Sequence, residues 1–272
     1  MPELPEVETI ACDLRERGLP GQVIERAVIR QPLVIRHPGA AAFAREVAGC
    51  GVEGVARHGK LLLIGLSNGA TITVHLKMTG QLTLARRDEP VPVHTHAVFE
   101  LGGERDLRFR DVRRFGYAAL LDEAELRQAL SSLGPDALAI SEADFAQRLR
   151  SRRALLKSLL TQQEFVAGLG NIYANEMLFD AGINPWRRAD RLSEEEAARL
   201  HASMRRVLEA AITCRGSSIS DYIDTAGRAG SFQERHRVYR KEVCPRCRGK
   251  VVREVRGGRS AFYCPRCQPA VT

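Results

Sequence analysis

Four cysteines in the last part of the sequence have the spacing of a metal site. They form two "CPRC" pairs separated by 16 residues: Cys244 with Cys247, and Cys264 with Cys267. A C-x-x-C turn presents two thiolates to one side of an ion, so two such turns complete the tetrahedral shell that Zn2+ prefers. Disulfide bonds are the alternative, which a cytosolic location disfavours. The pattern predicts one structural zinc, because four protein ligands leave no open position on the metal.

The opening stretch "PELPEVET" concentrates prolines and acids. One interpretation is a helix start, because proline suits the first helical position and acids suit the positive end of the helix dipole. This interpretation accounts for Pro5, Glu6 and Glu8, but it gives no role to Pro2 or Glu3. Pro2 and Glu3 are therefore candidate functional residues whose role has to come from the rest of the chain.

Charge is distributed unevenly along the 272 residues. The net charge is +8, but residues 228–272 carry 12 basic and 3 acidic side chains, whereas residues 1–227 carry 29 basic and 30 acidic ones. A basic block of this kind suits a polyanionic partner, of which nucleic acid is the commonest. A solvated tail is the alternative. A membrane surface is disfavoured, because the block mixes its charges with Cys, Gly and Pro instead of forming an amphipathic helix.

The elements that must position these residues follow a simple order. Residues 6–17 have helical spacing, and short β-rich runs separated by turns then extend to about residue 121, as in a two-sheet sandwich or barrel. Helical spacing dominates the next part, including residues 141–160 and a helix that starts at Ser193. The cysteine module is typical of a hairpin with the "GG" of residues 257–258 at its tip. The sequence therefore predicts an α+β multidomain chain.

Six motifs run in order along almost the whole chain. They are "PELPEVET" at the start, "RHGK" at 57–60, "HLKMTG" at 75–80, "RDVRRFG" at 110–116, "GLGNIYANE" at 168–176 and "GGRSAFYCPRC" at 257–267. Together they resemble the bacterial formamidopyrimidine-DNA glycosylase family. The resemblance implies a DNA repair enzyme that excises oxidised purines, such as 8-oxoguanine and formamidopyrimidines, from damaged double-stranded DNA.

The resemblance also implies three domains. Residues 1–122 would form a catalytic β-sandwich with a leading helix, and residues 123–235 a helical domain that contains a helix–two-turn–helix. Residues 236–272 would form a zinc-finger β-hairpin. We therefore expect the cysteine-bound zinc to hold the last domain together.

Pro2 is the nucleophile that the resemblance implies. Once Met1 is removed, Pro2 presents a secondary amine, and α-amino groups have a pKa of about 7.7–8.0 against about 10.4 for lysine. Such an amine can attack the sugar C1′ atom, expel the damaged base and form a covalent iminium, from which β- and δ-elimination follow. Glu3 would act as general acid and base, and Lys60 would assist elimination. Glu6 would support the site, or is simply a first-turn acid.

Further residues match the DNA contacts of the family. Asn171, at a helix start after a Gly-rich turn, and Arg259, on the hairpin, would hold the backbone on both sides of an extruded nucleotide. The family also places Arg259 in the catalytic set. Arg153 and His94 match other DNA-binding positions, and a solvated helix charge is the alternative for Arg153. Such contacts position the strand without reading its sequence.

Extruding a nucleotide leaves a gap in the stack that costs a few kcal/mol unless it is filled. The resemblance implies that Met78, Arg113 and Phe115 fill it, with Arg113 also bonding the orphaned base. Core packing is the alternative for Met78 and Phe115. Val112 stands where the family normally has a proline, which could loosen this loop.

Residues 214–233 occupy the place of the family's lesion-reading loop. Their small side chains could close backbone amides around an oxidised purine. Ser217 and Ser218 stand where the family usually has two threonines, so base preference is the feature that these motifs define least.

Two other functions stay open at this point. One is an endonuclease VIII-like glycosylase for oxidised pyrimidines, and the other is a catalytically inactive, zinc-containing sensor of DNA lesions. We expect a bacterial protein that is cytoplasmic, nucleoid-associated and monomeric. The sequence lacks an apolar run of membrane-spanning length, a signal-peptide layout and a stripe for a partner helix.

Overall fold

The computed structural model describes residues 1–256 and 258–270 and divides them into two compact units. Met1–Ser132 and Cys214–Ser231 form the first unit, and the remaining described residues form the second. The segment Cys214–Ser231, which the predicted boundaries include in the helical domain, belongs to the first unit. The three-domain division itself stays a prediction. Across the two described stretches, no helix is both long and apolar enough to cross a membrane.

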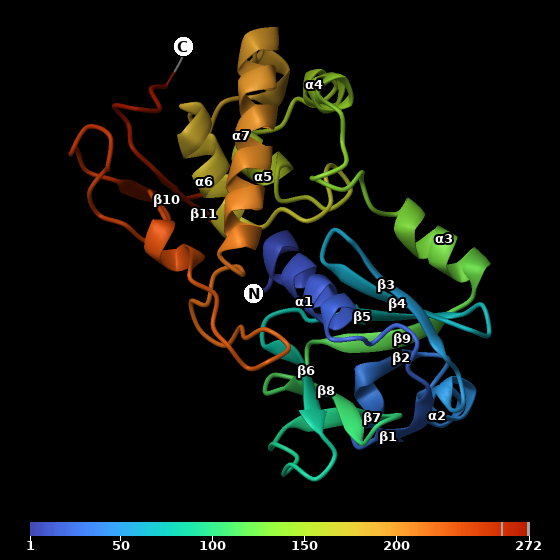
Figure 1. Ribbon diagram of the computed structural model, residues 1–272. Coiled ribbons are helices and arrows are strands. Elements are labelled where there is room, and N and C mark those ends of the chain that lie inside the picture. The colour runs from blue at the N-terminus through green and yellow to red at the C-terminus, as the bar shows by residue number, and fades with distance from the viewer. Residues whose placement is uncertain (257, 271–272) are drawn as a thin grey trace. The chain divides into compact units, whose positions relative to one another are not determined.

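Two sheets make up the centre of the first unit (Figure 1). All eight β-rich runs of the sequence form strands, so the predicted β-sandwich is confirmed. The short strand β2 and the helix α2 were not anticipated. One sheet has the order β1 (Ile24–Ile29), β7 (Thr95–Leu101), β8 (Arg105–Asp111), β6 (Gly80–Arg86); the other has β2 (Ile35–His37), β9 (Tyr117–Leu121), β5 (Thr71–His75), β4 (Leu61–Leu66), β3 (Val52–His58). The unit also contains α1 (Leu4–Glu16), η1 (Pro32–Val34), α2 (Ala40–Val47) and α3 (Glu123–Ser131).

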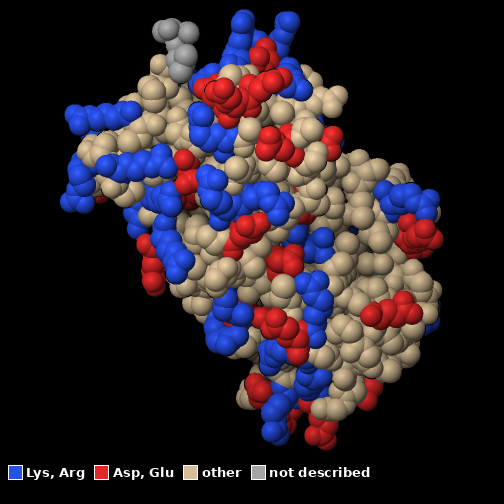
Figure 2. Space-filling view, turned by 45° about the horizontal axis from the view of Figure 1, so that its top comes forward, with Lys and Arg blue, Asp and Glu red and all other residues tan. Residues whose placement is uncertain are grey.

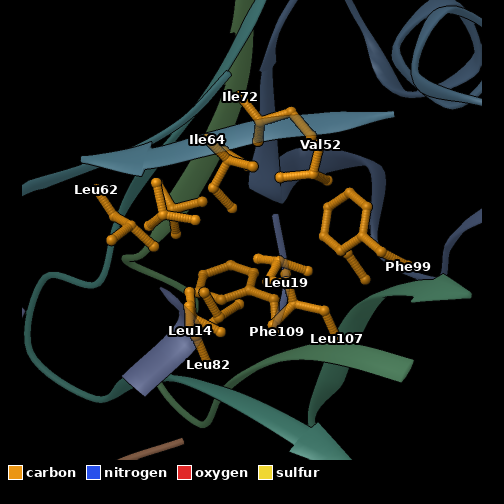
Figure 3. Close-up of a cluster of buried hydrophobic side chains, with 14 of the residues drawn as sticks. Leu14, Leu19, Val52, Leu62, Ile64, Ile72, Leu82, Phe99, Leu107 and Phe109 are labelled. Carbon is orange, nitrogen blue, oxygen red and sulfur yellow. The ribbon is translucent and has the colours of Figure 1, made fainter. Parts of the chain in front are cut away.

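The core of the first unit lies between the two sheets. Alternate residues of the strands point inward, as Leu62 and Ile64 do from β4 and Leu107 and Phe109 do from β8 (Figure 3). Leu14 of α1 lies in the same cluster. Each fully buried side chain of this size contributes about 1.5–3 kcal/mol relative to exposure. The core therefore fixes α1 and both sheets as one body.

The leading helix α1 is slightly displaced from its expected range of 6–17, since it spans Leu4–Glu16. Arg17 caps the helix, and Gly18 follows with a φ of +71°, which favours glycine. The N–H of Leu19 then donates to the Leu14 carbonyl over 2.9 Å. Because the chain turns sharply there, Leu19 enters the core. The turn and the core together orient the residues at the start of α1.

The second unit combines helices with the cysteine hairpin. The capping box predicted at Ser193 is present, since its hydroxyl accepts from the N–H of Glu196 over 3.1 Å and its own N–H donates to the Glu196 carboxylate. Gly257, in the predicted hairpin tip, lies outside the described residues. The elements are α4 (Glu142–Arg150), α5 (Leu156–Leu159), α6 (Asn171–Ala181), η2 (Ala189–Arg191), α7 (Glu194–Thr213), η3 (Phe232–Arg235), β10 (Val252–Arg256) and β11 (Arg259–Tyr263).

The helical pattern of residues 141–160 is interrupted in the structure. The chain leaves the helix after α4 and resumes one only at α5. In between, backbone groups pair with a distant segment: the Leu156 N–H donates to the Arg187 carbonyl over 2.9 Å, and the Lys157 N–H to the Pro185 carbonyl over 3.0 Å. These long-range bonds replace the bonds of a continuous helix, so the expectation of unbroken helical structure was wrong here.

Candidate functional site

Several residues that the sequence analysis proposes for the catalytic site lie at the start of α1 and are buried. Pro2 is buried, and Glu3 and Glu6 are 2% and 1% exposed. One oxygen of Glu6 accepts from the N–H of Glu3 over 2.7 Å, and the other accepts from the N–H of Ser217, also over 2.7 Å. Glu6 therefore links the first residues of the chain to the segment Cys214–Ser231, which lies beside α1 in Figure 1.

The backbone at Gly216 is matched to Glu6. Its φ is +81°, and a Cβ atom there would lie 2.7 Å from a Glu6 carboxylate oxygen. Any larger residue would strain the backbone and push against the carboxylate. Glycine at this position thus allows the loop to approach the buried acid.

Lys60 lies in the turn between β3 and β4 and is 7% exposed. The Arg57 side chain bonds Glu8 of α1 over 2.7 Å and donates to the Gly59 carbonyl over 3.1 Å. Burial raises the pKa of Glu8, but its bonds to Arg57, Cys12 and Arg15 outweigh burial and lower the pKa. Because one guanidinium joins α1 to the turn, the position of Lys60 is coupled to that of α1.

A positive region surrounds His75, at the end of β5. Burial, together with the charges of Lys77, Lys60 and Arg36, lowers the pKa of His75 to about 3. Its Nδ1 atom accepts from the Lys77 N–H over 3.0 Å, so the proton of the neutral ring lies on Nε2. Leu61 pairs with His75 in the sheet, which places the histidine beside the Lys60 turn. The sequence analysis gave His75 no role. The available signal was the pair of motifs "RHGK" and "HLKMTG", which lie at the ends of β3 and β5, on either side of β4.

Met78, Arg113 and Phe115 come together on the surface of the first unit. Met78 and Phe115 are 40% and 50% exposed, although both are large and apolar. Arg113 donates to the Met78 sulfur over 3.3 Å, and its guanidinium carbon lies 4.7 Å from the centre of the Phe115 ring. The alternative of core packing was therefore wrong for Met78 and Phe115. The three side chains form an exposed apolar wedge with a cationic partner.

Asp111 holds the loop that carries this wedge, and sequence reasoning missed it. Its side chain is fully buried and accepts from the hydroxyl of Thr79, the N–H of Arg113 over 3.1 Å and the N–H of Gly116 over 2.7 Å. A carboxylate that accepts several hydrogen bonds is a strong local anchor. The signal available in the sequence was an acid at the end of a β-rich run. The buried carboxylate therefore holds this turn at both Arg113 and Gly116.

His94 lies immediately before β7 and is exposed. Its φ of +67° is in the left-handed region, and its carbonyl accepts from the Asp111 N–H over 3.0 Å. His94 and the wedge loop are therefore attached to the same buried aspartate.

Asn171 begins α6 in the second unit. Its carbonyl accepts from the Lys157 ammonium over 3.1 Å and from the Asn175 side chain over 2.6 Å. Lys157 is fully buried, so it is not a solvated helix charge. A buried ammonium next to a helix start adds positive potential to the positive end of the helix dipole. The start of α6 is therefore a favourable place for an anion.

Arg153 and Arg259 are exposed cations of the same unit. Arg153 lies in the interruption between α4 and α5, and Arg259 begins β11 opposite Arg256. The strand β11 is attached to α6 by the bond from the Phe262 N–H to the Asn175 side chain, over 3.0 Å. In the space-filling view, Lys and Arg side chains project from the left-hand edge, where the hairpin lies (Figure 2).

The four cysteines of the hairpin meet at one point. The sulfur atoms of Cys244 and Cys267 are 3.7 Å apart, those of Cys247 and Cys264 are 3.5 Å apart, and all four lie within 4.8 Å of one another. A tetrahedral zinc with bonds of about 2.3 Å requires sulfur separations of about 3.8 Å. A disulfide would need about 2.05 Å. The residues fit zinc, and the prediction of one structural Zn2+ is confirmed.

The second unit contains two helices, α5 and α6, joined by a Gly-rich turn, together with a four-cysteine hairpin. This combination is typical of zinc-finger proteins that bind DNA. Three family models cover the chain in order. "Formamidopyrimidine-DNA glycosylase N-terminal domain" matches residues 1–118, "Formamidopyrimidine-DNA glycosylase H2TH domain" matches 133–223, and "Zinc finger found in FPG and IleRS" matches 241–270. The chain belongs to the formamidopyrimidine-DNA glycosylase family, which confirms the family expected from the motifs.

Individual relatives agree over the full length. Formamidopyrimidine-DNA glycosylase of Desulforamulus reducens is 43% identical over 278 residues, covering 99% of this chain and 100% of the relative. That of Moorella thermoacetica is 47% identical over 262 residues, covering 94% and 95%. A solved complex of Lactococcus lactis Fpg with DNA containing an abasic site has a TM-score of 0.91 and 32% identity, covering 98% of this chain and 100% of that one. A complex of MutM with DNA containing carbocyclic 8-oxo-G has a TM-score of 0.90 and 33% identity, covering 99% and 100%.

Proposed function

We propose that this protein is a DNA repair glycosylase that excises oxidised purines from duplex DNA and then cleaves the strand at the resulting abasic site. The observation that carries the proposal is the full-length match to the family, in sequence and in fold. Solved relatives are bound to DNA that contains an abasic site, a Fapy-dG or an 8-oxo-G analogue. The oxidised purine is therefore the substrate class that the comparisons favour over oxidised pyrimidines.

The Pro2 nitrogen would begin the reaction. It forms a bond to C1′ while the bond from C1′ to the base breaks, and the electron pair leaves with the base. The nitrogen then gives up its proton, which the base takes up. Glu3 would protonate the ring oxygen as the sugar opens, leaving an iminium between Pro2 and C1′. The burial of Glu3 keeps it close to the nitrogen in a site with little water. Met1 must be removed first, because an amide nitrogen is not a nucleophile.

Elimination would follow from the iminium. Loss of the 2′ proton expels the 3′ phosphate, and loss of the 4′ proton expels the 5′ phosphate. Lys60 would bind the phosphate and assist the first elimination, supported by the positive region around His75. Arg259 would assist the second. Glu6 would orient Glu3 and the loop, since it accepts from both backbones.

Met78, Arg113 and Phe115 would occupy the gap left by the extruded nucleotide. Their exposure and mutual contacts support this role, because exposed apolar side chains can insert between base steps. His94, Arg153 and Asn171 would contact the phosphate backbone. Arg113 would also bond the base opposite the gap.

Zinc would stabilise the hairpin that carries Arg259 and would take no part in the chemistry, because its four ligands are protein sulfurs. We infer that the protein acts as a monomer in the bacterial cytoplasm, at the nucleoid. Damaged double-stranded DNA is the partner that the basic last segment and the family support.

Borohydride trapping tests the proposal, because borohydride reduces the iminium to a stable amine. Protein whose intact mass shows Pro2 at the N-terminus should form a covalent adduct with a duplex that contains 8-oxoguanine, and none with the undamaged duplex. The absence of an adduct from such protein would contradict the proposed chemistry. Faster excision of thymine glycol than of 8-oxoguanine would instead assign the chain to oxidised pyrimidines.

A further inference from the structure

An ion-pair cluster that includes none of the residues with proposed catalytic roles joins α1 to the segment Cys214–Ser231. Arg215 donates to the Asp13 carboxylate over 2.6 Å and to the Asp224 carboxylate over 2.9 Å. The side chains of Asp13 and Asp224 are 5% and 0% exposed. Two buried carboxylates thus share one guanidinium, which balances part of the cost of burying their charges. We call these three residues the loop clamp.

The loop clamp also organises the backbone that follows it. Asp224 accepts from the N–H of Ala226 over 2.8 Å and from the N–H of Arg228 over 2.9 Å. Asp13 accepts from the Thr225 hydroxyl over 3.1 Å. One carboxylate therefore closes a turn within the loop, and the other attaches that turn to α1.

Residues 216–223 lie between the two loop positions of the clamp. No helix or strand is assigned anywhere in this stretch, whose residues are all described. Its shape therefore depends on side-chain anchors rather than on a regular hydrogen-bond pattern. Ser220 and Asp221, in the middle of this stretch, are exposed. Tyr222 is buried, and its hydroxyl donates to the Glu6 carbonyl over 3.3 Å.

Arg215 has an unusual backbone conformation within the loop clamp. Its φ is +60°, in the left-handed region that costs a non-glycine residue energy. The guanidinium reaches both carboxylates from this conformation. A strained residue that is held by two buried partners is typical of a functional constraint.

We propose that Asp13, Arg215 and Asp224 are positioning residues that fix both ends of the segment 216–223 on α1 and thereby hold it in the shape that contacts the damaged base. This inference rests on the proposed function. It predicts that loss of the clamp slows excision of a damaged base but does not slow cleavage at a site that has already lost its base. A substrate that has lost its base makes no contact with a base-reading segment, so its cleavage should not depend on the clamp.

The variant Arg215→Gly provides a direct test. Glycine suits φ of +60°, so the variant removes the guanidinium without adding backbone strain. We expect kcat/KM for excision of 8-oxoguanine to fall at least tenfold. Cleavage of the same duplex with a preformed abasic site should stay within twofold of the parent value. Asp13→Asn, which keeps the shape of the side chain, should act in the same direction.

The control is Asp106→Asn, since Asp106 is a buried partner of Arg108 elsewhere in the first unit. This variant should leave the ratio of the two activities unchanged. Equal losses on both substrates in Arg215→Gly would show a general structural role and overturn the proposal. Full activity of this variant on both substrates would also overturn it.

Hydrogen exchange tests the clamp independently of the proposed enzymatic function. Amides of residues 216–226 should exchange at least tenfold faster in free Arg215→Gly than in the parent protein, whatever its activity. Unchanged exchange would overturn the clamp itself. If the parent protein excises no oxidised purine, the proposed function fails, and the exchange measurement still decides whether the clamp holds the loop.

Discussion

The start of α1 and the zinc-finger hairpin both carry residues with proposed contacts to DNA, but different forces hold them. In the first unit, Glu6 and Asp111 are anchored by backbone hydrogen bonds on top of a large apolar core. The hairpin has a small cluster of buried residues, and cysteines are prominent in it. The first unit can therefore position side chains through packing, whereas the hairpin depends on its metal.

Removal of zinc should have the largest effect, and it should act on the hairpin but not on the first unit. Structural zinc supplies roughly 10–16 kcal/mol of folding free energy in small zinc-finger domains. With chelator, or in Cys264→Ser, we expect the amides of β10 and β11 to lose protection from hydrogen exchange, and DNA affinity to fall at least a hundredfold. The strands of the first unit should keep their protection. Loss of protection in both units would contradict the contrast between metal and packing.

Glu3→Gln should remove activity while leaving the first unit folded. Glutamine keeps the size of the side chain but cannot supply the proton, and general acid–base catalysis contributes about 10²–10⁴-fold. We expect excision of 8-oxoguanine to fall by that factor, measured in single-turnover reactions. The midpoint of thermal unfolding should change by less than about 2 °C, which corresponds to about 0.5–1 kcal/mol for a domain of this size. A folded variant with full activity would remove Glu3 from the mechanism.

Asp111→Asn tests whether hydrogen bonds to one buried carboxylate position the wedge. The new amide group would face backbone N–H donors, so at least one donor is left without an acceptor, at a cost of about 1–3 kcal/mol. We expect that loss in urea unfolding, together with weaker binding to lesion-containing duplex. Asp88→Asn is the matched control, because Asp88 pairs with Arg86 at the exposed surface and should change stability by less than about 0.5 kcal/mol. Equal effects of the two substitutions would argue against the anchor.

The smallest effect concerns pH and applies to both units. Burial, followed by nearby cations, lowers the pKa of His75 to about 3 in the first unit and that of His236 to about 4 in the second. Both pKa values lie below the value of about 6.5 in the unfolded chain, so the unfolded state takes up protons first as the pH falls. Stability should therefore decrease from about pH 6.5 downward, towards pH 3 for His75 and pH 4 for His236.

Each histidine should contribute at most about 2 kcal/mol to the loss between pH 6.5 and pH 5. Urea unfolding at these two pH values measures it. His75→Asn, whose side-chain oxygen can replace Nδ1 as acceptor, should flatten the decrease, and His236→Asn should do the same for the second unit. A slope that neither substitution changes would mean that other groups cause the acid sensitivity.

The sequence predicted what local patterns control. The presence of α1, the main strands of the sandwich, the capping box at Ser193 and the zinc ligands follow from spacing, turn residues and metal chemistry. The family followed from six motifs. The roles of Pro2, Glu3 and Lys60 stay predictions that the geometry is compatible with.

The sequence did not predict contacts between residues that are far apart along the chain. The interruption after α4 depends on backbone bonds to residues 185–187, and the loop clamp pairs residues about 200 positions apart. The low pKa of His75 depends first on its burial and then on nearby cations, among which Lys60 and Arg36 come from other parts of the chain. Local periodicity carries no information on such pairs. Asp111 was missed for the same reason, since its partners belong to two turns that only the folded sheets bring together.

The return of Cys214–Ser231 to the first unit has a consequence for synthesis on the ribosome. The sandwich is complete by Ser132, whereas the segment that lies on α1 emerges about 80 residues later. At roughly 5–20 residues per second, several seconds separate the two events. During that interval Asp13 is already in place without its arginine, so a nascent or truncated chain would have the sandwich but not the segment that we expect to distinguish a damaged base.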